Sequence, residues 1–180
     1  MGILGKLYWR RITPAVQGLI PLDDWKKPDA MTADQFGAAV RTLKIEFTTI
    51  AAMASMGMKD YPSAVTYYKV LVAIDPTSPV SHFSIGVAEL QKTPPNANAG
   101  FFELARAIAL KVPNAPGVQT YLKNHLIRYQ QTSCKNLGDD QDNALITLAT
   151  SSGDNMPATL NIPSADDLQK ARNDTKNFIP

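Results

Sequence analysis

The chain has 180 residues, of which 44% are apolar and 19% charged, so it is long enough for one domain with a buried core. This balance excludes a collagen-like, a disulfide-built or a disordered chain. The net charge of +2 is too small to indicate a nucleic-acid-binding face, and residues 137–180 are the acidic part, with seven acidic and three basic groups.

Residues 1–31 are expected to form an N-terminal arm and linker. The arm lacks the order of a secretory signal, because Arg10 and Arg11 lie inside the apolar segment, and residues 15–22 are too short to span a membrane. A cytoplasmic location is therefore slightly favoured over the alternatives. The arm either packs on the protein or a neighbouring chain, which we expect, or binds a membrane surface through Trp9 and the two arginines.

The first helix is expected to begin after Thr32. Thr32 and Gln35 have the spacing of a capping box, and apolar residues then recur in steps of four and three, as in an amphipathic helix. These apolar residues are Phe36, Val40, Leu43, Phe47, Ile50 and Ala54. The helix should continue to about Met56 and end at Gly57.

Prolines and polar residues divide the rest of the chain into further helices. Pro62 is tolerated in a first helical turn, whereas Pro76 and the pair Pro94–Pro95 interrupt helix. Ser164 with Asp167 predicts another N-cap. The expected helices cover about 62–74, 80–91, 99–110, 117–132, 140–151 and 165–178. No segment alternates with a period of two, so the sequence predicts an all-α protein.

Two stretches carry a family resemblance. Residues 57–76 (GMKDYPSAVTYYKVLVAIDP) resemble the second half of a tetratricopeptide repeat, with Tyr61, Ala64, Tyr68, Leu71 and Pro76 at the family's spacings. The following pair is similar, with Ile85-Gly86 where the family prefers Leu-Gly, and with Ala107, Leu110 and Pro113. From Pro76 to Pro113 is 37 residues, against about 34 in the standard repeat. The resemblance covers about residues 45–131.

The resemblance implies an αα-hairpin right-handed solenoid, with a repeat domain over residues 32–136 and capping helices over 137–180. It also implies that Ala64, Gly86 and Ala107 let helices approach closely, while Tyr68 and Phe102 fill the spaces between helix pairs. The chain departs from the family at Thr48, where an aromatic residue is usual, and at Ala51-Ala52, which replace Leu-Gly.

In this family the first helix of each pair forms a concave binding face. By resemblance the face comprises Glu46, Thr49, Met53, Met56, Val80, Phe83, Val87, Tyr121, His125 and Arg128. Methionine suits an adaptable apolar groove, and the alternative is that Met53 and Met56 pack in the core. The family's clamp for a peptide carboxylate is absent, since Thr49, Met53 and Ser84 stand at its positions.

The sequence shows no pattern of residues that supports catalysis or metal binding. His82 and His125 lack a metal-ligating partner at helical spacing, and Cys134 is expected to be an ordinary residue at a helix end. The acidic run 138–143 lacks the Gly and Glu of a calcium loop and is expected to cap a helix. Glu46, Glu89 and Glu103 are expected to be isolated on helices and to face solvent.

The sequence therefore predicts a non-enzymatic protein-protein interaction module or an assembly subunit. We expect no catalytic residue, cofactor, metal, small-molecule substrate or nucleic acid. The alternative is a membrane-surface accessory protein held by the basic segment of residues 1–27. The repeats resemble those of bacterial proteins.

Overall fold

The computed structural model describes residues 25–131 and 135–176 and is helical there, without a strand among those residues. The predicted all-α class is confirmed. The helices are α2 (Ala33–Gly57), α3 (Tyr61–Ile74), α4 (Pro79–Gln91), α5 (Ala97–Ala109), α6 (Ala115–Gln130), α7 (Lys135–Ser152) and α8 (Ala165–Lys176).

Local capping signals set several helix starts. The Thr32 hydroxyl accepts from the backbone N–H of Gln35 at 3.2 Å, and the Gln35 side chain accepts from the Thr32 N–H at 3.0 Å. Ser164 and Asp167 form the same reciprocal pair ahead of α8, at 2.9 and 3.2 Å. Both predicted caps are confirmed, because each depends only on residues three apart in the chain.

The predicted start and capping of α7 are wrong. The helix begins at Lys135 rather than near residue 140, so the acidic run lies within it instead of ahead of it. Asp142 is buried and accepts a hydrogen bond of 3.0 Å from the side-chain amide of Gln119 on α6. The carboxylate therefore joins two helices, which is an interaction that local sequence does not encode. The boundary expected between residues 136 and 137 falls inside α7.

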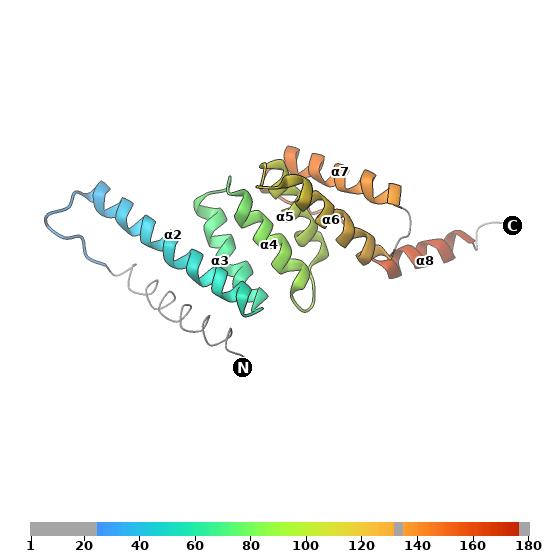
Figure 1. Ribbon diagram of the computed structural model, residues 1–180, viewed down its shortest axis with the longest axis horizontal. Helices are drawn as coiled ribbons and strands as arrows, with labels where there is room; N and C mark the ends of the chain where they lie inside the picture. The colour runs from blue at the N-terminus through green and yellow to red at the C-terminus, as the bar shows by residue number, and fades with distance from the viewer. Residues whose placement is uncertain (1–24, 132–134, 177–180) are drawn as a thin grey trace.

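Helices that follow one another in the chain also pack against one another. Contacts join α2 to α3, α3 to α4, α4 to α5, α5 to α6 and α6 to α7, and further contacts join α5 to α7 and α6 to α8. Figure 1 shows α2, α3 and α4 following one another along the long axis of the molecule, and then α5 and α6 with α7 beside them. A face of the molecule is therefore built from several successive helices.

The apolar core has two main clusters. The smaller lies among α2, α3 and α4 and includes Ala52, Ala64, Tyr68 and Ile85. The larger joins α5, α6 and α7 to the segment that precedes α8, and its buried members are Ala97, Phe101, Phe102, Leu104, Ala105, Ala107, Val112, Val118, Leu122, Leu126, Leu145, Ala149 and Ile162. Burial of such residues supplies most of the stabilisation of the helices.

The buried side of α2 differs from the predicted stripe. Small residues, including Ala51, Ala52 and Ala54, are buried, whereas Ile50 is exposed. Small side chains let α3 approach α2 closely, so the contact needs no large residue on this side. The expectation that Ile50 faces the core is corrected, and it adds an apolar side chain to the surface.

Candidate functional site

Aromatic rings from two helices meet on one surface of the molecule. Phe83 on α4 and Tyr121 on α6 pack edge to face with centroids 6.4 Å apart, and the ring of His125 lies 4.1 Å from that of Tyr121. Phe83 and Val87 also rest on the larger core cluster. The rings are thus held by the core on one side, and α4 and α6 contribute to one face.

Phe83, Tyr121 and His125 are together called the ring row. Partial burial shifts the pKa values of Tyr121 and His125 in this row. Burial raises the pKa of the Tyr121 hydroxyl, while a hydrogen bond from Gln91 opposes that rise. Burial, followed by the nearby Arg128 charge, lowers the pKa of His125. Both side chains are therefore favoured in their neutral forms, which suits an apolar contact surface.

The predicted face residues on α2 include a side chain that is more exposed than those of the ring row on α4 and α6. The Met53 side chain is 61% exposed, and Ile50 beside it is exposed as well. Met56, in contrast, is half-buried and packs against the smaller core cluster. Met53 and Ile50 thus present apolar surface to solvent, whereas Met56 helps to hold α2 against the core.

A hollow connects α2 with the start of α4. Its volume is about 180 Å³, and it is lined by Ile45, Thr49, Leu71, Ile74, Asp75, Ser78 and Ser81. Thr49 from α2 therefore lies near the first turn of α4. Val80, in that same turn, is 53% exposed.

The structure places the ten predicted face residues in distinct settings. Phe83, Tyr121 and His125 form the ring row, and Val87 lies beneath it on the core. Met53 and Val80 project as exposed apolar residues, and Glu46 and Arg128 are exposed charged residues. Ile45 and Ile50 also expose apolar surface on α2 and were missed, because the helical stripe assigned Ile50 to the core.

A buried polar cluster centres on His82, which is only 1% exposed. Its Nδ1 lies 2.6 Å from a carboxylate oxygen of Glu103 on α5, and its Nε2 lies 3.1 Å from the carbonyl oxygen of Pro76. Asp154, after α7, approaches Nε2 at 3.6 Å and accepts a hydrogen bond of 2.8 Å from Arg106. The cluster joins α4, α5 and the segment after α7.

Both ring nitrogens of His82 face acceptors, so both must carry a proton to satisfy them. Burial lowers the pKa of His82, but the hydrogen bond to Glu103, the Pro76 carbonyl and the charges of Glu103 and Asp154 outweigh it. The net effect is a raised pKa, which favours the imidazolium form. The buried ring thus links α4 to Glu103 on α5 and to Asp154 after α7.

The expectation that Glu89 and Glu103 face solvent is wrong. Glu103 bonds His82, and Glu89 is buried between Lys92, with which it forms an ion pair, and Lys69, whose Nζ lies 3.8 Å away. A buried carboxylate requires such partners, since an unpaired charge in the interior costs several kcal/mol, on the order of the whole stability of a small domain. Helical spacing places Lys92 beside Glu89, because the two are three residues apart, but it does not show that Glu103 meets His82 on another helix.

Residues 25–131 and 135–176 form neither a metal site nor a membrane span. No group of three or more His, Cys, Asp or Glu residues there is placed to hold a metal ion. None of the helices built by those residues is long and apolar enough to cross a bilayer. Cys134 and the predicted membrane-binding residues Trp9, Arg10 and Arg11 lie outside the described residues. Trp25, at the described end of the arm, packs on Phe36 with centroids 6.0 Å apart.

Comparisons with protein-family models, with curated proteins and with solved structures gave no match for this chain. No family is assigned on that basis, and the tetratricopeptide resemblance stays a prediction from the sequence.

Proposed function

We propose that this chain is a non-catalytic docking module of the tetratricopeptide type, in which successive helix pairs form a solenoid. Two features support the proposal. Helices pack in chain order, and the residues that carry the family spacing, such as Ala64, Tyr68 and Gly86, are buried where helices meet. A helical repeat array has this pattern, since each unit contacts its neighbours.

The docking face proposed here consists of Glu46, Thr49, Ile50, Met53, Val80, Phe83, Val87, Tyr121, His125 and Arg128. The observation that carries the proposal is the exposure of Met53 on α2 and Val80 on α4, together with the ring contact that joins Phe83 on α4 to Tyr121 on α6. Exposed apolar side chains bordered by polar residues mark interaction surfaces. Met53 is flexible and polarizable, so it adapts to the shape of a partner.

The chemistry of the face indicates the chemistry of the partner. Tyr121 and Arg128 belong to the residue types that dominate binding energy at protein interfaces. The exposed apolar side chains Ile50, Met53 and Val80 gain most from a partner that also presents apolar side chains. We propose a protein partner with an apolar contact strip, and a role for this chain as a scaffold or assembly subunit.

Introducing negative charges on the face tests the proposal. The double variant Met53→Glu plus Val80→Glu should fold normally, because both side chains are exposed, but should lose the partner in quantitative affinity capture from the native source. The matched control is Val70→Glu on α3, a similarly exposed apolar residue outside the face. Equal capture by the wild type and the double variant would contradict the proposal. Capture of lipid vesicles alone would favour the membrane-surface alternative.

A further inference from the structure

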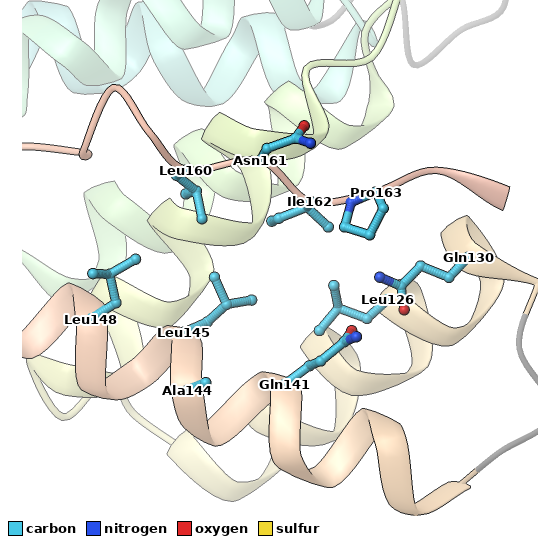
Figure 2. A pocket seen from close by; sticks show the side chains of 10 residues that line it. All are labelled: Leu126, Gln130, Gln141, Ala144, Leu145, Leu148, Leu160, Asn161, Ile162 and Pro163. Atoms are coloured by element: carbon cyan, nitrogen blue, oxygen red, sulfur yellow. The ribbon is translucent and has the colours of Figure 1, made fainter. Parts of the chain in front are cut away.

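A pocket of about 240 Å³ lies between α6, α7 and the extended segment before α8. Figure 2 shows side chains from all three parts converging on one space. The lining residues are Leu126, Gln130, Gln141, Ala144, Leu145, Leu148, Leu160, Asn161, Ile162 and Pro163. Its α6 residues, Leu126 and Gln130, are displaced from His125 of the docking face by about 100° and about 140° around the helix. The pocket is therefore separate from that face.

Gln130 is the residue that gives this pocket chemical character. It is only 4% exposed, and its Nε2 has no hydrogen-bond acceptor within the described part of the structure. Figure 2 shows the Gln130 amide directed toward the space between Leu126 and Pro163. Buried amide donors almost always have a hydrogen-bond acceptor in folded proteins, so an unpaired donor that faces a cavity requires an explanation. A bound ligand that places an acceptor atom beside Gln130 Nε2 would explain it.

The lining limits what that acceptor can be. Every lining residue is uncharged, and most are aliphatic. A carboxylate or phosphate would lose its hydration here without meeting a cation, which is unfavourable. A neutral carbonyl oxygen accepts from Gln130 without that penalty. The carboxamides of Gln141 and Asn161 supply further donors and acceptors, so an amide fits better than a ketone.

The size of the pocket limits the apolar part of the ligand. A cavity of roughly 150 Å³ holds one benzene molecule. The pocket volume of about 240 Å³ therefore accommodates a single ring or a short branched chain together with one amide group. Leu126, Leu145 and Ile162 provide the apolar contacts.

We propose that this pocket binds a small uncharged molecule that has one compact apolar group and one amide carbonyl. The carbonyl oxygen accepts the hydrogen bond from Gln130 Nε2, and the apolar group packs among the leucines. The proposal is independent of protein docking at the α2, α4 and α6 face, since it rests on a different set of residues.

Benzamide is the probe that tests the proposal, with benzoate and benzylammonium as charged single-ring probes of similar size. Binding is measured by ¹⁵N–¹H NMR titration of the full chain, including the side-chain amide signals. A single-ring ligand should bind weakly, with a Kd on the order of millimolar. Benzamide should shift the Gln130 amide signal, while the two charged probes should bind at least about tenfold more weakly.

Gln130→Met removes the donor but keeps the shape of the side chain. Benzamide affinity should fall about five- to tenfold, and the free protein should melt at the same or a higher temperature, because an unpaired donor is gone. The matched control is Asn124→Met on the exposed side of α6, which should leave affinity unchanged. Ala144→Phe, at the pocket rim, should abolish binding by filling the space. Absence of benzamide binding, equal binding of all three probes, or unchanged affinity in both pocket variants would overturn the proposal.

Discussion

Gly86 on α4 and Gly100 on α5 face each other where the two helices cross. A Cβ atom on Gly86 would lie 2.9 Å from the carbonyl oxygen of Gly100 and 2.8 Å from Leu104 Cγ. A Cβ atom on Gly100 would lie 2.6 Å from Leu90 Cγ. Real Cβ atoms do not approach so closely, so the two glycines set the separation of the helices. This close packing fixes the position of α4, which carries Val80 and Phe83, relative to α5.

Gly86→Ala should destabilise the protein, although alanine favours helix more than glycine does. The clash involves backbone atoms of Gly100 and Leu104, which cannot move aside as a flexible side chain does. We expect a loss of about 1–3 kcal/mol in the free energy of unfolding, measured by urea denaturation. The control is Gly37→Ala on α2, where an added Cβ meets nothing within 4 Å. That variant should gain about 0.5–1 kcal/mol, and a similar gain for Gly86→Ala would contradict the close contact.

The His82–Glu103 pair should make stability depend on pH. The pKa of His82 is raised in the folded protein, so folding favours the protonated ring. The contribution is fully present below the unfolded pKa, about 6.5, and is lost as pH rises through the higher folded value. Urea denaturation across this range should therefore show the His82 contribution declining toward alkaline pH.

The charged groups around His82 define the control for this prediction. Glu103 and Asp154 approach the ring directly, Arg106 bonds Asp154, and Asp75 lies near enough to interact electrostatically. Glu103→Gln keeps an acceptor but removes the closest charge, so the variant should lose most of the pH dependence. The same slope in the wild type and the variant would show that another group causes it.

Thr32→Ala should weaken the start of α2. The substitution removes the hydroxyl that accepts from the Gln35 N–H and costs about 1 kcal/mol of helix stability. Amide hydrogen exchange should accelerate in the first turn of α2, with little change in α5. The control is Thr42→Ala within the same helix, whose hydroxyl bonds the Ala38 carbonyl that the helix already satisfies. Equal acceleration in both variants would argue against the cap.

Sequence predicted the helices well because their ends are encoded locally. The capping pair Thr32–Gln35, the Pro62 start of α3 and the interruption at Pro76 all act within a few residues. The start of α7 failed for the same reason. Its acidic residues resemble a cap, but Asp142 bonds Gln119, which lies 23 positions earlier in the chain.

The candidate sites depend on contacts between helices and were predicted less completely. Periodicity places Lys92 one turn after Glu89, but it shows neither the burial of Glu89 nor the contact between Glu103 and His82. The pocket at Gln130 needs α6, α7 and the segment through Ile162 to meet, and no motif indicates that meeting. The family resemblance suggested most residues of the proposed docking face, whereas the exposure of Ile50 became visible only through the packing of α2.

The most direct test of docking at the α2, α4 and α6 face is site-specific photo-crosslinking. A photoreactive phenylalanine derivative replaces Met53 in one version of the protein and Val70 in another, since both positions are exposed and apolar. Irradiation in the native source, followed by mass spectrometry, reports what lies within a few ångströms of each position. The docking face predicts one specific protein adduct from position 53 and none from position 70. Adducts from position 70 alone, or the same adducts from both positions, would contradict it.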